Sequence, residues 1–127
     1  MIAGIGQDIV EIERIRRIHH KYKDAFAERI LCEAELQEYR ETNFPIRFLA
    51  KRFAAKEAVA KALGTGFSNG INPRMICIEH DELGRPVVML YEQARVRADQ
   101  LGADVSWISI SDEKLYAVAF VVMECLK

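Results

Sequence analysis

The sequence predicts a single α+β domain over residues 1–127, with a small antiparallel sheet packed against helices. Its length of 127 residues is close to the commonest size of one globular domain. The predicted strands are few and mostly joined as hairpins, and the predicted helices cluster early in the chain. These features favour an α+β fold with the element order βαααββαββ over a doubly wound parallel sheet.

The first half predicts one strand followed by three helices. Residues 2–10 alternate so that Gly4, Gly6 and Asp8 share one face of the strand, where the glycines leave space for another group to approach the backbone. Apolar residues then recur at helical spacing, and Gly64 stands where glycine commonly ends a helix. The three helices are expected at residues 11–26, 33–40 and 47–63.

The second half predicts two hairpins separated by a helix. Short runs rich in β-branched residues are interrupted by turn sequences, one of which is Gly84-Arg85-Pro86. A run of helical spacing between the hairpins ends at Gly102. The expected strands are 75–79, 87–90, 105–111 and 115–123, and the expected helix is 92–101.

Composition limits the function classes. Eighteen basic and nineteen acidic side chains give a net charge of -1, which argues against a general nucleic-acid binder. The longest apolar run, 115–123, is far shorter than the ~18 residues of a membrane span, and no signal sequence is seen. Three cysteines without a close pair suggest neither a disulfide framework nor a zinc site. We therefore expect a soluble, reduced, cytoplasmic protein.

The helix expected at residues 47–63 has an unusual distribution of charge. Arg52 and Lys56 fall inside its apolar arc, while Glu57 and Lys61 lie beside small alanines. One interpretation is that these are surface charges making contacts between residues four apart. The other is a polar site in which cations hold a phosphate beside a carboxylate-bound metal ion.

Asp8 and Glu57 are candidate ligands for magnesium. Mg²⁺ prefers hard oxygen ligands and is commonly held by one or two carboxylates, with water and substrate phosphate completing the shell. The glycine-rich loop 64–70 follows a helix and lacks the Gly-Lys-Ser/Thr ending of a P-loop, so as a nucleotide motif it is weak. It either caps the helix or lets a ligand approach the backbone.

One segment is densely basic. Arg14, Arg17 and Lys21 lie on the outward face of the first predicted helix, together with neighbouring basic residues. Such a face is either simply solvated or suited to steering an acidic partner into place. A non-catalytic module that binds an acidic protein or RNA through this helix is the alternative to an enzyme.

Several segments together resemble the bacterial holo-acyl-carrier-protein synthases, a family of 4'-phosphopantetheinyl transferases. The most specific is the Lys56-Glu-Ala-Val-Ala-Lys61-Ala block at this distance downstream of Gly6-Gln-Asp8. The glycines that follow the block, the Gly84-Arg-Pro turn and Ser109-Ile-Ser111 complete the match over almost the whole chain.

The resemblance implies an enzyme that moves the phosphopantetheine arm of coenzyme A onto a serine of apo-acyl carrier protein, in support of fatty acid biosynthesis. It implies a 4'-phosphopantetheinyl transferase fold assembled as a homotrimer, with each active site between two subunits, and no nucleic-acid or membrane partner. The expected base for the serine proton is Glu57, acting directly or through a bound water.

The resemblance also assigns site residues. Asp8 and Glu57 are expected to hold Mg²⁺, and Lys61 to lie by the phosphates. Many relatives have a histidine where this chain has Asp112, so a turn or capping role is expected there in place of a phosphate contact. The coenzyme A site is expected to include Arg52, Lys56, Lys61, Gly64, Thr65, Gly66, Arg85, Pro86 and Ser109, and carrier docking to use Arg14, Arg17 and Lys21.

Overall fold

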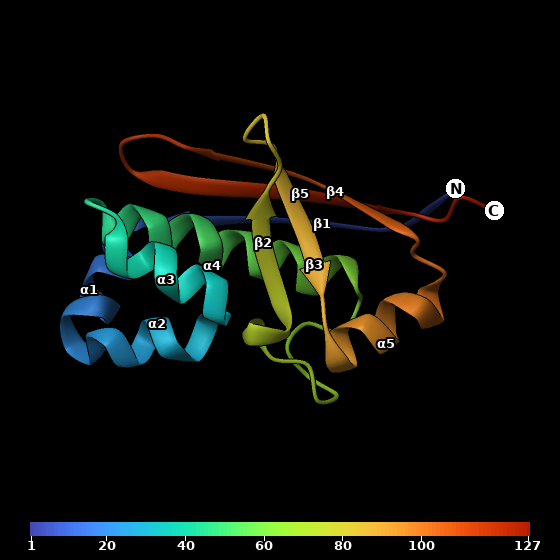
Figure 1. The fold of residues 1–127 in the computed structure, drawn as a ribbon, viewed down its shortest axis with the longest axis horizontal. Helices are drawn as coiled ribbons and strands as arrows, with labels where there is room; N and C mark the ends of the chain where they lie inside the picture. The colour runs from blue at the N-terminus through green and yellow to red at the C-terminus, as the bar shows by residue number, and fades with distance from the viewer.

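The structure is a computed structural model that describes residues 1–127. One long helix, α4, packs against a three-stranded sheet and is crossed by a two-stranded hairpin, while three short helices gather at one end (Figure 1). The elements are β1 (Ile2–Glu11), α1 (Ile12–Tyr22), α2 (Asp24–Ile30), α3 (Glu33–Glu41), α4 (Pro45–Ala62), a 3-10 turn (Pro73–Met75), β2 (Ile76–His80), β3 (Pro86–Leu90), α5 (Glu92–Leu101), β4 (Val105–Asp112) and β5 (Tyr116–Glu124).

The strands form two antiparallel sheets where one was expected. β5 lies between β1 and β4 in the larger sheet, and β2 pairs only with β3. The α+β class is confirmed. The two termini lie together, because the amino group of Met1 donates a hydrogen bond of 2.9 Å to the carbonyl of Cys125 (Figure 1).

The expected single helix over residues 11–26 is wrong, since the chain forms two helices there. Lys23, with φ of 52°, separates α1 from α2. The apolar spacing continues across this break, so periodicity could not locate it. The element order is therefore βααααββαββ, with one more helix than the sequence predicted.

Helix α4 spans Pro45–Ala62, so it begins two residues and ends one residue before the expected bounds of 47–63. Pro45 occupies its first turn, where a missing backbone N–H costs nothing, and Gly64 follows it with φ of 79°. Alanines along α4 allow β1 to come unusually close. A Cβ added to Gly4 would lie 2.2 Å from the carbonyl oxygen of Ala62, and one added to Gly6 would lie 1.9 Å from that of Ala58.

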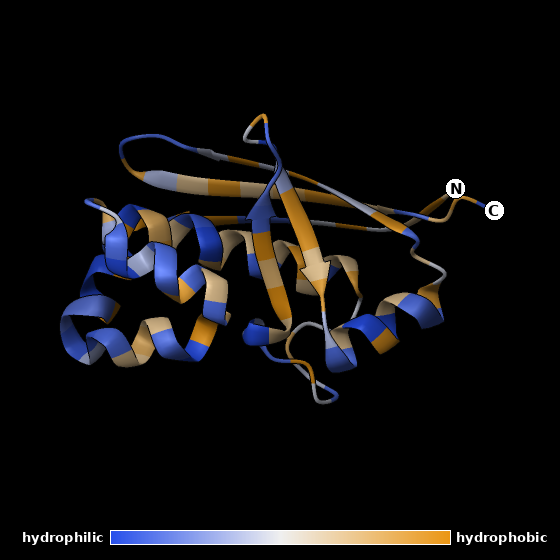
Figure 2. Cartoon of the chain, in the orientation of Figure 1, coloured by the Kyte–Doolittle hydropathy of each residue, from blue (hydrophilic) through white to orange (hydrophobic).

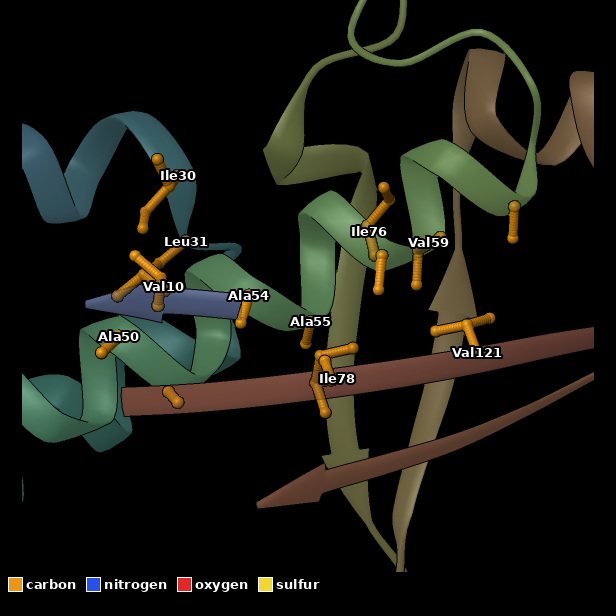
Figure 3. Close-up of a cluster of buried hydrophobic side chains, with 14 of the residues drawn as sticks. Val10, Ile30, Leu31, Ala50, Ala54, Ala55, Val59, Ile76, Ile78 and Val121 are labelled. Carbon is orange, nitrogen blue, oxygen red and sulfur yellow. The ribbon is translucent and has the colours of Figure 1, made fainter. Parts of the chain in front are cut away.

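The hydrophobic core surrounds α4. Val59 of the helix packs in one buried cluster with Ile76 and Ile78 of β2 and Val121 of β5, and α1 to α3 extend this core at the other end of α4 (Figure 3). Hydrophobic residues occur along the strands of the larger sheet (Figure 2), and Ile5, Ile9 and Phe120 among them are exposed. No helix is long and apolar enough to cross a membrane.

The expectation that no cysteines pair is wrong. Cys32 at the start of α3 and Cys77 in β2 form a disulfide across 45 residues of sequence, and Cys125 is free. The pair was missed because α3 and β2 are distant in sequence and meet only through tertiary packing. The cysteines therefore give no argument for a reducing compartment.

Candidate active site

Asp8 reaches α4 because β1 and α4 run side by side with matching repeats. Two strand residues advance ~6.7 Å and four helix residues ~6 Å, so the contacts of Gly4 with Ala62 and Gly6 with Ala58 step along both elements together. Asp8 is the next residue on the same face of β1. Its carboxylate accepts a hydrogen bond of 3.1 Å from the Lys61 ammonium, which also donates to the Gln7 carbonyl at 2.9 Å.

Glu57 belongs to the same cluster. Burial raises its pKa, the negative charge of Asp8 raises it further, and the positive charges of Lys61 and Arg14 oppose the shift. Two neighbouring carboxylates are a suitable donor set for a divalent cation, which relieves the repulsion between their negative charges. The structure thus brings together Asp8, Glu57 and Lys61, and the residues present fit magnesium.

Arg52 and Lys56 do not present their charges to this cluster, so their expected role in binding coenzyme A requires correction. The two residues are 3% and 1% exposed. The Lys56 ammonium lies 2.6 Å from the Glu35 carboxylate, and Arg52 lies 3.3 Å from the same group. Burial lowers the pKa of both side chains while Glu35 opposes that shift. Their cations are used inside the protein and are not available to a phosphate.

The glycine-rich loop after α4 borders a surface cavity of about 430 Å³. Gly64 and Thr65 line one side of it, and Gln93 and Arg97 of α5 line the other. The Arg97 guanidinium donates a hydrogen bond of 2.9 Å to the Leu63 carbonyl, which ties α5 to the end of α4. The loop therefore caps α4, which was one of the two expected roles. It also borders this cavity, about one helical turn after Lys61.

The other residues assigned to coenzyme A lie elsewhere in the chain. Arg85 and Pro86 form the tip of the β2–β3 hairpin and share a surface pocket with Trp107 of β4, and Arg85 lies 5.8 Å from the Trp107 ring. No hydrogen bond or ion pair joins this tip to Asp8, Glu57 or Lys61.

Ser109 and Asp8 face opposite sides of the larger sheet. Asp8 of β1 pairs with Ala119 of β5, which pairs in turn with Ile110 of β4. These three residues lie on the surface of the sheet that packs against α4. Ser109 pairs with Phe120 and shares the open surface with Trp107. Because successive strand residues alternate between faces, Ser109 and Asp8 of one chain cannot line one site.

Asp112 anchors the β4–β5 hairpin to α4. Its carboxylate accepts a hydrogen bond of 2.7 Å from Arg47 and lies 3.8 Å from the Lys51 ammonium. Arg47 also donates to the Glu113 carbonyl at 2.7 Å. Asp112 thus neutralises two cations, and a role at the turn, as expected, accounts for it without a phosphate contact.

The basic side chains of α1 lie next to the carboxylate cluster. Arg14, Arg17 and Lys21 are all exposed. The Arg14 guanidinium lies 5.8 Å from the Phe53 ring of α4, and its charge acts on Glu57. A partner held on this face would therefore sit beside Glu57.

Sequence reasoning missed Glu35. It stands in α3, the helix expected at residues 33–40, and it is fully buried. One available signal was its place three residues after the N-cap residue Cys32, where a glutamate carboxylate often accepts a hydrogen bond from the N-cap N–H. Its carboxylate does accept from the Cys32 N–H at 3.0 Å.

The chain is similar over almost its whole length to one known family of proteins. The family model described as the 4'-phosphopantetheinyl transferase superfamily matches residues 4–121. The chain is 50% identical over 123 residues to the holo-[acyl-carrier-protein] synthase of Hamiltonella defensa, covering 97% of this chain and 98% of that one.

Two solved structures extend the comparison. The holo-[acyl-carrier-protein] synthase of Neisseria meningitidis superposes with a TM-score of 0.90 at 46% identity, covering 98% of this chain and 99% of that one. The synthase of Bacillus anthracis, in complex with coenzyme A (3',5'-ADP), superposes with a TM-score of 0.81 at 36% identity, covering 98% of each chain.

Proposed function

We propose a catalytic assignment for this chain on the premise that it belongs to the 4'-phosphopantetheinyl transferase superfamily and, within it, to the holo-acyl-carrier-protein synthases. The chain transfers phosphopantetheine from coenzyme A to apo-acyl carrier protein. The observation that carries the assignment is the meeting of Asp8 from β1 with Glu57 and Lys61 from α4. The reaction supports fatty acid synthesis, which uses the holo carrier, and we retain the cytoplasm as the proposed location.

Asp8 and Glu57 are the proposed magnesium ligands. Bound there, the ion would supply charge stabilisation for the coenzyme A diphosphate. The exposed Lys61 ammonium, fixed by Asp8 and the Gln7 carbonyl, provides a further positive charge for the phosphates. The glycine-rich loop and its cavity one turn away are available to the rest of the coenzyme.

The bond changes follow from this placement. The carrier serine oxygen forms a bond to the phosphorus that bears pantetheine, and the bond from that phosphorus to the 3',5'-adenosine bisphosphate oxygen breaks. Glu57, acting directly or through a bound water, is the proposed acceptor of the serine proton, because it lies with Asp8 and Lys61 at the proposed position of the diphosphate. The α1 cations beside it are suited to hold the acidic carrier in place.

A complete site is proposed to need two subunits. The open surface of the larger sheet exposes Ile5, Ile9, Trp107 and Phe120, each 44% to 61% exposed, in neighbouring positions of three strands. Ser109 lies among them, on the face opposite to Asp8. If copies of the chain pack through this surface as a homotrimer, Ser109 and the Arg85 tip of one copy can approach Asp8 of another.

The transfer reaction tests the assignment. Purified protein, coenzyme A, Mg²⁺ and apo-acyl carrier protein are mixed, and the carrier is weighed by mass spectrometry. We expect one phosphopantetheine per carrier, and a loss of rate of at least about a hundredfold for Glu57→Gln, which removes the base and one metal ligand.

Glu33→Gln is the matched control, because this exposed α3 carboxylate makes no ion pair. It should keep the wild-type rate. Undiminished transfer by folded Glu57→Gln protein would remove Glu57 from the site, and no transfer by folded wild-type protein would refute the enzyme assignment.

A further inference from the structure

Three charged side chains are buried together at the back of the catalytic helix, outside the site described above. Glu35 of α3 is 0% exposed, and Arg52 and Lys56 of α4 are 3% and 1% exposed. We call these three residues the buried triad. Charges so deeply buried are costly unless paired, so their presence in a small core calls for a physical reason.

Glu35 uses both carboxylate oxygens to connect three elements. Oε1 accepts from the Cys32 N–H at 3.0 Å and lies 2.6 Å from the Lys56 ammonium. Oε2 accepts from the Ile78 N–H at 2.9 Å and lies 3.3 Å from Arg52 Nε. The carboxylate therefore joins the start of α3, the middle of β2 and one face of α4.

Lys56 is fully engaged in the same network. Besides Glu35, its ammonium donates to the Pro73 carbonyl at 3.0 Å and to the Ile76 carbonyl. An ammonium has three hydrogens, and these partners use all of them. Lys56 is thus fixed both around the axis of α4 and along it.

On α4, the residues of the buried triad and the proposed catalytic residues lie on neighbouring rows of the helix surface. Arg52 and Lys56 are one turn apart on α4, and Glu57 and Lys61 form the next row, about 100° around the axis. Fixing Lys56 therefore fixes the direction in which its neighbour Glu57 points.

The side of α4 that packs against β1 does little to define that rotation. Its contacts with β1 are made through backbone at Ala58 and Ala62, opposite two glycines. Helix packing is oriented by ridges of side chains fitting into grooves, and alanines form only shallow ridges. Directional ion pairs supply the orientation that such a smooth surface lacks.

We propose that Glu35 is a positioning residue, which sets the rotation and axial place of α4 through Arg52 and Lys56 and so holds Glu57 at the distance from Asp8 that transfer requires. This inference rests on the proposed function, because it concerns the geometry of that same site. Glu35 itself touches neither substrate nor the reacting atoms.

The test separates position from stability. Replacing a buried ion network by apolar side chains of similar volume commonly preserves stability or increases it, whereas removing one member leaves an unpaired charge. We would compare Glu35→Gln with the triple variant Glu35→Met, Arg52→Met and Lys56→Met. Each is assayed for carrier modification at least ten degrees below its own melting midpoint, with kcat and KM for coenzyme A measured separately.

We expect the triple variant to fold but to melt below the wild type, because methionine leaves the backbone partners of Glu35 and Lys56 unpaired. Below its own melting midpoint it should lose at least about tenfold in kcat, with a smaller change in KM, because a misplaced Glu57 affects the reaction more than coenzyme binding. Glu35→Gln should also lose kcat. The matched control is Glu38→Gln, since the Glu38 carboxylate contacts Arg52 at 3.0 Å but is exposed; its kcat should not change.

A folded triple variant with wild-type kcat would overturn the positioning role. If neither altered protein folds at any temperature, the triad serves the fold and the proposal is likewise overturned. Activity of wild-type protein and of Glu38→Gln establishes the transferase assignment independently, so either outcome leaves that assignment standing.

Discussion

At the scale of single residues, two glycines without side chains determine where Asp8, the proposed metal ligand, lies. Gly4 and Gly6 let β1 approach the backbone of α4, and Asp8 follows them on the same face. A methyl group at Gly6 would overlap the Ala58 carbonyl, so the strand would have to move away and carry Asp8 with it. The distance between the two carboxylates thus depends on residues that take no part in the chemistry.

The side chain of Tyr39 holds the three short helices α1, α2 and α3 together. Its hydroxyl donates to Asp24 at 2.8 Å and lies 3.0 Å from Nε2 of His19, so it links α1, α2 and α3. Burial raises the pKa of Tyr39 to about 12, and the hydrogen bond and charge of Asp24 add to the shift. The hydroxyl therefore stays protonated as a donor through neutral and moderately alkaline pH.

We predict that Tyr39→Phe lowers the free energy of unfolding by about 1 kcal/mol, the usual net value of such a hydrogen bond. The folded pKa is above the unfolded value, so the contribution is fully present below pH 10. It is lost as the pH rises from 10 towards about 12, where the unfolded state releases its proton first. Denaturant unfolding at pH 8 and pH 11 measures this.

The control is Tyr91→Phe, because the Tyr91 side chain is 45% exposed and makes no hydrogen bond. It should leave stability unchanged at both pH values. An equal effect of the two substitutions, or a Tyr39→Phe effect that does not shrink with rising pH, would contradict the assignment.

At the scale of elements, the disulfide joins α3 to β2 beside the buried triad. The Cys32–Cys77 bridge closes a loop of 45 residues. In the chain-entropy description, a loop of that length stabilises the folded state by up to about 4 kcal/mol. Glu35 bonds the N–H groups of Cys32 and Ile78, so a covalent link and an ionic link hold the same two elements.

We predict that Cys77→Ala, or reduction by a dithiol, lowers the melting midpoint by several degrees or more, because the open loop regains entropy in the unfolded chain. Alkylation under denaturing conditions without reductant should modify one cysteine, Cys125, and all three after reduction. Cys125→Ser is the control and should melt like the wild type. Alkylation of three thiols without reductant would refute the bridge.

The sequence predicted an element well where the residues of that element alone carry the pattern. The alternation in β1, the helical spacing and terminal glycine of α4, and both hairpins follow from neighbouring residues. The break at Lys23 did not, because apolar spacing continues through it. Splitting the strands into two sheets also depends on packing that no local pattern records.

The candidate site divides in the same way. The charge of Glu57 and Lys61 beside alanines indicated a polar site, and the structure brings both to Asp8. The same reasoning misjudged Arg52 and Lys56, because the partner that buries them, Glu35, comes from a distant helix. A sequence shows that a cation lies in an apolar arc but does not show which carboxylate meets it.

At the scale of the whole molecule, the two faces of the larger sheet are put to different uses. One face is closed by α4 and holds Asp8 and Asp112, and the other exposes a row of large apolar side chains. Exposed apolar patches of this kind commonly mark protein interfaces. The distribution of proposed site residues over both faces is consistent with a site that one chain cannot complete.

We therefore predict a mass in solution of three times the chain's 14.5 kDa, measured by light scattering. Phe120→Glu places a charge in the centre of the open face, where Phe120 is 44% exposed, and burying that charge between copies would be costly. The variant should be a folded monomer, and it should lose transfer activity because Ser109 and Asp8 of one chain face opposite ways.

The same substitution elsewhere supplies the control. Phe44 is 70% exposed at the N-cap of α4 and belongs to no strand, so Phe44→Glu adds the same charge outside the open face of the sheet. It should remain a trimer with wild-type activity. A wild-type protein that is monomeric and fully active would contradict the shared site, whereas a monomeric, inactive Phe120→Glu beside an active Phe44→Glu ties activity to assembly through this face.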